Sequence, residues 1–355
     1  MSEKVYFLEV ENREDPKKIV ERLISALNKF QFLSFIEDKD YVAIKTHFGE
    51  NNFNGFVDPV FIRMFGELVK ERDGNPFMTE TSTLYRGNRT NAVDHIHLAE
   101  EHGFSIHDTG MPIIMADGLF GDEEIEVEIP GKIYKKVMVA SLLSKIQALL
   151  VITHFTGHIV AGYGGALKNL GMGLSSRKGK MIQHSTSKPS IKKKKCTSCG
   201  ECIRWCPADA ISFVDGKAWI DKNICIGCAE CLAVCRFDAV KYNWSESYYK
   251  LQQKIAEHAM GVVKTMEGRS LFINFLLKIS KDCDCMNKYE KVVPDIGILI
   301  SKDPVALDSA SLDLAENKIR KKLSQISYDI PYRVQLDHAA DIGFGDTEYE
   351  LIPID

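Results

Sequence analysis

The sequence predicts an α/β fold, with a mostly parallel sheet covered by helices on both faces and one cysteine-rich insertion. Short apolar segments alternate with amphipathic helical patterns on both sides of the insertion, as in a parallel sheet buried on both faces. Eight of the ten cysteines fall between residues 196 and 235. We therefore expect an α/β domain in two parts, 1–187 and 245–355, with a separate domain at 188–244.

The first part begins its helices at polar caps followed by proline or by an apolar residue. Asp15-Pro16 and Asp58-Pro59 each precede apolar residues at a period of 3.6, which predicts two helices, and a third helix is expected over Asn91–His102. Ala140–Ile146 is also expected to be helical. The predicted extended segments are Val5–Glu9, Tyr41–Phe48, Asn75–Thr81, Ser105–Asp108, Glu123–Ile129 and Ala148–His154.

The second part continues the same alternation. Asp303-Pro304 opens a helix to Arg320, with Asp303 as the capping residue. Two further helices and three strands are predicted, at Glu246–Lys264, Tyr332–Ala340, Leu271–Ile279, Ile296–Ser301 and Tyr349–Ile354, the last as an edge strand.

Composition and charge limit the classes of protein to which this chain can belong. The chain has 355 residues, of which 45% are hydrophobic, and a net charge of −4, which gives no argument for a nucleic-acid partner. The most apolar stretch, Val137 to Phe155, is broken by polar residues, so no membrane insertion is expected. The amino terminus shows no signal peptide, and cysteine use on this scale suggests the cytoplasm.

The eight clustered cysteines follow one repeated pattern. Four read C-x-x-C-x-x-C-x-x-x-C-P, and four more repeat the spacing without the proline; they are Cys196, Cys199, Cys202, Cys206, Cys225, Cys228, Cys231 and Cys235. Zinc sites usually use two C-x-x-C pairs, so the spacing favours iron–sulfur clusters over zinc.

Residues 190–244 resemble bacterial two-cluster ferredoxins, with Arg236 where that family usually has proline. The resemblance implies an α+β domain with two [4Fe–4S] clusters, each taking three cysteines from one run and the fourth from the other. One cluster would use Cys196, Cys199, Cys202 and Cys235, and the other Cys225, Cys228, Cys231 and Cys206. A redox partner protein is implied, and Lys192–Lys195 is either its docking site or a solvated linker.

Polar residues gather at the predicted carboxyl ends of three strands, where α/β proteins bind ligands. Lys45 and His47 end one strand, Glu80 another, and His154 and His158 a third. The histidines could be metal ligands or proton shuttles, or structural buried residues. Lys45 could hold a substrate carboxylate or phosphate, or pair with Glu80. We read Asp94, His95 and His97 as surface residues on a helix.

A glycine-rich run follows His158, with five glycines in the twelve residues from 162 to 173. Such a run lets backbone amides approach a ligand, so Gly164, Gly165, Lys168 and Asn169 are candidate cofactor-binding residues. A tight packed turn explains the same pattern. The run matches neither a Walker A loop nor G-x-G-x-x-G.

The flanking segments resemble the domain-of-unknown-function family 362, whose members often carry a ferredoxin module. The matching stretches are Lys45–Glu50, His158–Gly173, Cys283–Cys285, Pro294–Ile298 and Asp303–Asp308. Gly164-Gly165-Ala166-Leu167-Lys168 also looks like the G-G-x-K-like loop of nickel-pincer lactate racemases, with the lysine displaced by one position. The second likeness implies a cofactor or small organic acid in the cleft.

Cys283 and Cys285 form a C-x-C pair that could bind a soft metal, form a strained disulfide, or be incidental thiols. The neighbouring Asp282 and Asp284 are expected to raise the pKa values of these thiols.

Together these features suggest an iron–sulfur oxidoreductase that exchanges electrons between a carrier and a small-molecule site in the α/β domain. Its candidate catalytic residues are Lys45, His47, Glu80, His154, His158, Cys283 and Cys285. The alternatives are a non-enzymatic electron carrier and a metal- or cofactor-delivery protein.

Overall fold

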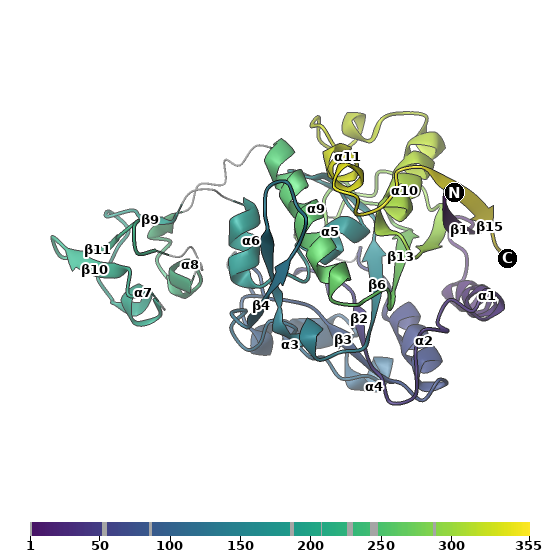
Figure 1. Cartoon of the computed structure of the whole chain (residues 1–355), viewed down its shortest axis with the longest axis horizontal. Coiled ribbons are helices and arrows are strands. Elements are labelled where there is room, and N and C mark those ends of the chain that lie inside the picture. Colours follow the sequence, from purple (N-terminus) through teal and green to yellow (C-terminus); the bar gives the residue numbers. More distant parts are fainter. Residues whose placement is uncertain are drawn as a thin grey trace.

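The structure is a computed structural model that describes residues 2–51, 55–84, 87–184, 188–206, 208–225, 230–241, 248–286 and 289–355. Figure 1 shows a large α/β body and, beside it, a small lobe formed by the segment between α6 and α9. Cys228, predicted to be a cluster ligand, lies outside the described residues.

The body is built on a seven-stranded sheet in the order β15-β1-β14-β13-β6-β2-β3. Of these strands, β14 runs antiparallel to both neighbours and all other pairs are parallel, which confirms the predicted mostly parallel sheet. β15 lies at the edge, as predicted. The strands are β1 (Glu3–Glu9), β2 (Tyr41–Lys45), β3 (Asn75–Thr79), β6 (Ala148–His154), β13 (Ser270–Leu276), β14 (Gly297–Ser301) and β15 (Tyr349–Pro353).

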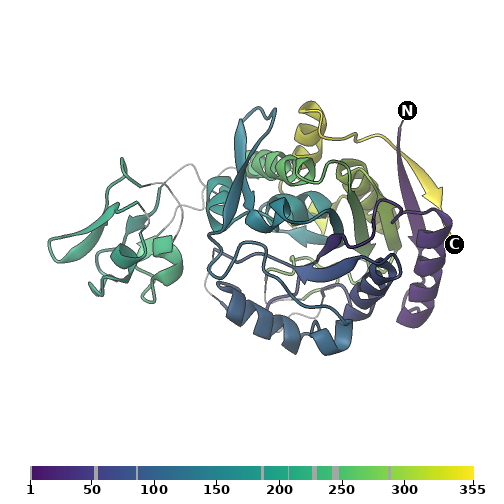
Figure 2. The ribbon, with the colours of Figure 1, turned by 60° about the horizontal axis from the view of Figure 1, so that its bottom comes forward.

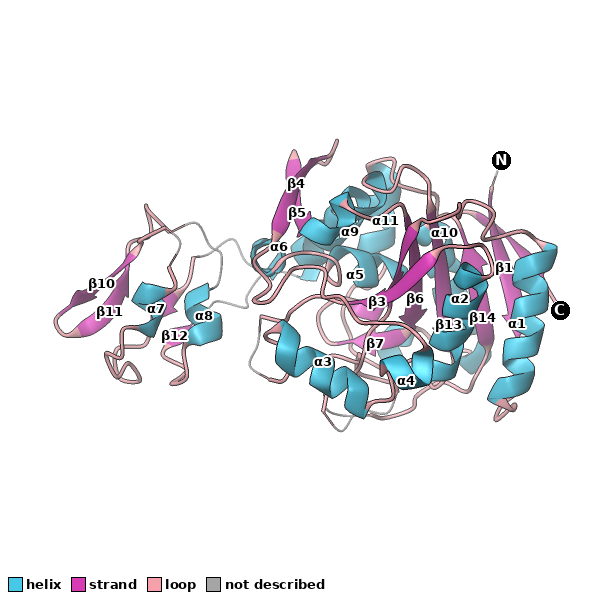
Figure 3. Ribbon diagram, turned by 90° about the horizontal axis from the view of Figure 1, so that it is seen from below, coloured by secondary structure: helices cyan, strands magenta, loops and turns pink. Residues whose placement is uncertain are grey.

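Helices cover both faces of this sheet, as Figures 2 and 3 show. The pleat sends Val42 and Ile44 into one hydrophobic cluster and Ala43 into the other. One face carries α1 (Pro16–Lys29), α2 (Pro59–Lys70), α3 (Ala92–Glu101) and, beside α2, α4 (Ile106–Thr109). The other carries α5 (Ala166–Gly171), α9 (Tyr248–Lys264), α10 (Pro304–Ile319) and α11 (Val334–Asp341).

Short elements complete the body, and some differ from expectation. β4 (Glu124–Glu128) pairs with β5 (Lys136–Ala140), a strand that was not predicted. The helix expected over Ala140–Ile146 is only a single 3₁₀ turn, η1 (Ser141–Ser144). The remaining elements are the hairpin β7 (Thr156–His158) and β8 (Gly162–Gly164), α6 (Arg177–His184) and η2 (Leu323–Gln325).

The prediction of an extended Ser105–Asp108 was wrong, because local capping makes this segment helical. The Ser105 hydroxyl accepts a hydrogen bond from the backbone N–H of Asp108, and Gly110 ends the turn in the left-handed region at φ 72°. Asp303 caps α10 as predicted, accepting from the N–H groups of Val305 and Ala306.

In its described residues, the small lobe consists of two short strand pairs and helical turns around one hydrophobic cluster that contains cysteines. Its elements are β9 (Ser190–Ile191), α7 (Glu201–Arg204), β10 (Ile211–Val214), β11 (Lys217–Ile220), α8 (Glu230–Val234) and β12 (Val240–Lys241). Within the described ranges of the whole chain, no helix has the length and apolar character needed to cross a membrane.

Asp308 on α10 fixes the start of α5 against the sheet. Its buried carboxylate accepts hydrogen bonds from the backbone N–H groups of Ala166 and Leu167, at 2.7 and 2.9 Å, and from Asn274 Nδ2 at 2.7 Å. Gly165 has no side chain to obstruct this contact, since a Cβ there would lie 2.4 Å from Asp308 Oδ1.

We expect Asp308→Ala to lower the free energy of unfolding by about 3 kcal/mol, because three buried donors lose their acceptor. Urea unfolding of the full chain would measure the loss. Asp38→Ala, at an exposed side chain, is the matched control and should leave the midpoint nearly unchanged. Equal midpoints for the two variants would contradict this role of Asp308.

Candidate functional site

A cavity of about 370 Å³ opens at the carboxyl ends of β2, β3 and β6, beside α5, α6 and α9. The structure brings most of the predicted site residues to its wall: His47, Glu80, His154, His158, Gly164, Gly165, Lys168, Asn169, Cys283 and Cys285. Lys45 lies behind the wall and is fully buried.

Lys45 is held by acceptors from three segments. Its Nζ lies 2.7 Å from Glu80 Oε1, 2.7 Å from Asn169 Oδ1 and 3.1 Å from the carbonyl oxygen of Thr46. Three acceptors use all three ammonium protons. Of the two interpretations of Lys45, this geometry matches the structural ion pair with Glu80.

His47 is buried and lies beside a cation. Arg89 Nη1 lies 2.8 Å from His47 Nε2, and the guanidinium, which can only donate, also binds Glu50 Oε2 at 3.0 Å. Burial, and then the charge of Arg89, hold the pKa of His47 well below its usual range. Arg89 was missed from the sequence because it lies eight residues beyond the predicted strand end at Thr81, and ten beyond the observed end of β3 at Thr79.

His154 joins the end of β6 to Asp284, which lies between the two cysteines. Its Nδ1 lies 2.7 Å from Asp284 Oδ1, and its Nε2 lies 3.0 Å from the carbonyl oxygen of Leu277. Oxygen acceptors thus face both ring nitrogens. Asp284 is a hydrogen-bond partner of His154, and Asp282 accepts from the Tyr328 hydroxyl. Each carboxylate beside the cysteines therefore has a hydrogen-bond partner.

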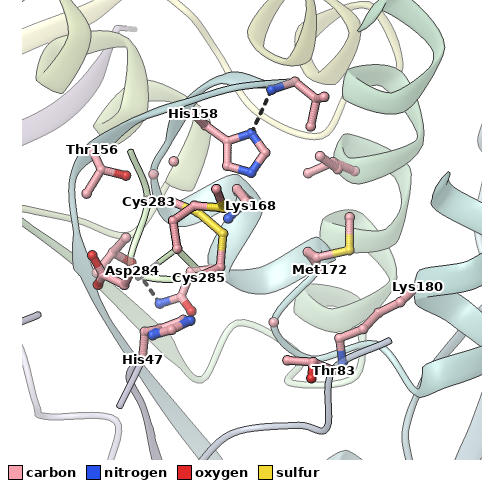
Figure 4. A pocket seen from close by; sticks show the side chains of 18 of the residues that line it. His47, Thr83, Thr156, His158, Lys168, Met172, Lys180, Cys283, Asp284 and Cys285 are labelled. Carbon is pink, nitrogen blue, oxygen red and sulfur yellow. Dashed lines mark hydrogen bonds between the residues drawn. A yellow bond between two sulfur atoms is a disulfide. The ribbon is translucent and has the colours of Figure 1, made fainter. Parts of the chain in front are cut away.

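Cys283 and Cys285 are joined by a disulfide at the cavity wall, beneath His158 (Figure 4). A ring nitrogen of His158 and the two sulfurs lie within 4.8 Å of one another, so these three residues form a possible metal-binding group. A disulfide offers no thiolate, so metal could bind only after reduction.

The hydrogen bonds of His158 favour a different use of its ring. Nδ1 accepts from the backbone N–H groups of Val160 and Ala161, at 3.2 and 2.9 Å, so the neutral ring carries its proton on Nε2. Burial, and then Lys168, keep the pKa of His158 well below its usual range. A metal on Nε2 would move the proton to Nδ1, against two N–H donors. The remaining Nε2–H suits hydrogen bonding to sulfur.

The glycine-rich run is a tightly packed turn, one of the two interpretations that the sequence left open. A Cβ on Gly171 would lie 2.2 Å from the carbonyl oxygen of Ile255 on α9. The first two N–H groups of α5 bind Asp308 and are therefore not available to a phosphate. From this run, Gly164, Lys168 and Asn169 reach the cavity wall along with Gly165.

Two lysines of the wall have different surroundings. Lys180 donates to Thr81 Oγ1 at 2.6 Å and to the Ser175 carbonyl oxygen at 2.7 Å. Lys168 makes no hydrogen bond or ion pair with any residue that the structure describes. Burial lowers the pKa of each lysine to about 8.

The sequence also missed Lys180 and His184, which line the cavity from one face of α6. Their spacing of four residues was a usable signal. The interpretation of His95 as a surface residue was wrong: its ring is fully buried and lies edge-on to Phe48 at 5.7 Å, whereas Asp94 and His97 are exposed.

A family model described as a domain of unknown function, DUF362, matches residues 42–313, a range that contains all the cavity residues. The chain belongs to the DUF362 family. No curated protein matches this DUF362 chain.

Two solved structures are similar to this DUF362 protein in outline. One is a lactate racemase apoprotein from Thermoanaerobacterium thermosaccharolyticum, with TM-score 0.40 and 12% identity, covering 76% of this chain and 50% of the other. The second is a Thermotoga maritima protein from a structural genomics consortium, with TM-score 0.48 and 11% identity, covering 88% and 60%. The DUF362 chain thus spans half of the first structure and 60% of the second, and similarities this weak support no inference about activity.

The two lysines at positions 45 and 168 of this DUF362 protein should differ in their effect on stability. We expect Lys45→Met to cost about 3–5 kcal/mol, because Glu80 is left as an unpaired buried charge. Lys168→Met should cost less than about 1 kcal/mol, since no hydrogen bond is lost. Urea unfolding of both variants measures the difference, and similar losses would contradict the assignment.

Proposed function

We propose that this DUF362 protein is an iron–sulfur redox protein that passes electrons from its cysteine-rich lobe to the Cys283–Cys285 disulfide in the cavity. The observation that carries the proposal is a contact between the two: Leu232, next to Cys231 in the lobe, packs against a small cluster of Leu84 and Met181, of which Leu84 lines the cavity.

The donor set of the lobe fits two [4Fe–4S] clusters. Burial, and then the neighbouring thiols of Cys235, Cys196 and Cys199, raise the pKa of Cys202 to about 11, so Cys235 of the second run is a near neighbour of the first run. This proximity supports the exchanged ligand set, with Cys196, Cys199, Cys202 and Cys235 at one cluster and Cys206, Cys225, Cys228 and Cys231 at the other.

The last cysteine of each run accepts a hydrogen bond from the backbone N–H four residues later. The backbone N–H of Ala210 donates to Cys206 Sγ at 3.2 Å, and that of Ala239 donates to Cys235 Sγ at 3.3 Å. Such N–H···S bonds tune cluster potentials, and their repetition supports a pseudo-symmetric pair of sites.

The contacts between lobe and body favour one cluster as the electron donor to the cavity. Trp205, next to Cys206, lies edge-on to Phe120 of the body with ring centroids 5.2 Å apart. Leu232 follows Cys231. Cys206 and Cys231 belong to the same proposed cluster, so this cluster would face the body and the other would face the external carrier.

The exposed Lys192–Lys195 run precedes Cys196 of the outer cluster, which supports docking of an acidic one-electron carrier there. The two clusters would supply one electron each when bound. Two electrons and two protons convert the disulfide to two thiols. His158 Nε2–H is placed to donate a hydrogen bond to the sulfur that leaves. Clusters and a dithiol both fit a reducing compartment such as the cytoplasm.

A second candidate function is metal binding by the reduced cysteines and His158, favoured by the close approach of their three ligand atoms. A carrier without catalysis is the third. We retain 1–187 and 245–355 as one α/β domain and 188–244 as the inserted ferredoxin-type domain.

Anaerobic analysis of the purified protein should give about eight irons and eight sulfides per chain, because each cluster holds four of each. Plasma mass spectrometry over all first-row metals is the measurement. Zinc in place of iron would overturn the cluster assignment. Stoichiometric nickel, zinc or cobalt in addition to iron would support the second candidate function.

Reductive titration should take up about four electrons per chain, two by the clusters and two by the disulfide. We expect Cys283→Ser to take up about two, with an unchanged cluster spectrum. Anaerobic titration with a calibrated one-electron reductant tests this expectation. An identical uptake in both proteins would show that the disulfide accepts no electrons from this route.

A further inference from the structure

We propose that the cavity binds small organic carboxylates, with Lys168 as the counter-ion and the rest of the bound molecule held against Cys283 and Cys285. This inference names the class of molecule that the same cavity binds. That the bound molecule takes part in a redox reaction rests on the proposed function.

Among the cations of the cavity wall, Lys168 has neither a hydrogen-bond partner nor an ion-pair partner in the described part of the chain. Lys45 pairs with Glu80, Arg89 with Glu50, and His154 with Asp284. Lys180 is held by a hydroxyl and a carbonyl oxygen. Among the residues that the structure describes, no partner is found for the half-buried Lys168 ammonium. A cation in a partly desolvated wall gains most from an anion that shares the wall.

Lys168 stands close to the sulfurs. A Cβ on Gly164 would lie 3.6 Å from Lys168 Cδ and 4.0 Å from Cys283 Cβ, so both side chains pass over this glycine. Figure 4 shows Lys168 beside Cys283. An anionic group held by Lys168 therefore places the next few atoms of the molecule over the cysteine pair.

The rest of the cavity favours a carboxylate over a phosphate or a macromolecule. Its volume of about 370 Å³ fits a small molecule. Phosphate sites usually present several backbone N–H groups, and those at the start of α5 bind Asp308. Apolar residues that suit a carbon skeleton also line the cavity: Leu84, Ile159, Val160, Met172, Leu251 and Ile255.

Two alkylating reagents that differ in charge test the inference. Iodoacetate carries the carboxylate and iodoacetamide is its neutral counterpart, and with each the thiolate displaces iodide. We would reduce the full chain anaerobically with a phosphine, label it with each reagent, and measure the alkylation rates of the peptide containing Cys283 and Cys285 by mass spectrometry.

The ratio of iodoacetate to iodoacetamide rates should fall about three- to tenfold in Lys168→Met, as expected for one ion pair. Lys168→Arg should keep most of the preference. Lys136→Met, at an exposed lysine on β5, is the control and should match the wild type. An unchanged ratio in Lys168→Met would overturn the proposal.

The wild type alone gives an independent test, because the ratio cancels the thiolate fraction common to both reagents. Burial lowers the pKa of Lys168 to about 8, so the preference should be complete well below pH 8 and vanish above it. A preference for iodoacetate that rises with pH would contradict the proposal, because loss of the Lys168 proton can only weaken the attraction of a carboxylate. The charged or titratable groups that interact electrostatically with Lys168 are Lys45, His47, Glu80, Arg89, His158, His184 and Asp284.

This experiment separates the inference from the proposed function. The reductant is chemical, so the carboxylate preference does not depend on electron flow from the lobe. If Lys168 favours iodoacetate but the disulfide takes up no electrons, the carboxylate site stands and the proposed redox route is wrong. If the disulfide takes up electrons but Lys168 gives no preference for iodoacetate, only the carboxylate site is wrong.

Discussion

The buried ammonium of Lys45 is the interaction on which the site depends. It joins the end of β2 to Glu80 beyond β3 and to Asn169 on α5, and Asn169 in turn donates to Thr153 Oγ1 on β6. A cation in this position is stable only while every proton has an acceptor. The strand ends and the helix must therefore keep one arrangement, which holds the cavity wall in register with the sheet.

The same requirement sorts the polar residues around the cavity into two groups. Charges that are paired, such as Arg89 with Glu50 and His154 with Asp284, shape the wall. Groups that keep an unused donor, Lys168 and the Nε2–H of His158, both lie near the cysteine pair. Only the polar residues that take no part in this network of ion pairs and hydrogen bonds are available for chemistry. They are a minority of the polar residues around the cavity.

Much of this arrangement was predictable from sequence. Period and capping placed the strands and helices of the sheet, because burial on two faces produces continuous apolar strands and Asp-Pro starts fix helix ends. Strand-end reasoning gathered His47, Glu80, His154 and His158. It could not distinguish Lys45 from Lys168, since both are lysines near glycine or strand ends and only the geometry of their acceptors separates them. Arg89 and Lys180 escaped because they reach the cavity from loops and helices outside the strand ends. The prediction for Ser105–Asp108 was wrong because a segment of four residues is too short to show a helical or strand period. Its conformation is set by the cap at Ser105 instead.

The order of strands has a consequence for how the chain is made. β6 lies between β2 and β13, and β13 follows the lobe in sequence. On the ribosome, β6, β2 and β3 can pair as soon as they emerge, but one long edge of β6, with every residue buried in the finished fold, has no neighbour until the lobe has been synthesised. An uncovered apolar edge invites pairing with other chains. While the lobe is being translated, β6 therefore has an unpaired apolar edge that could pair with another chain.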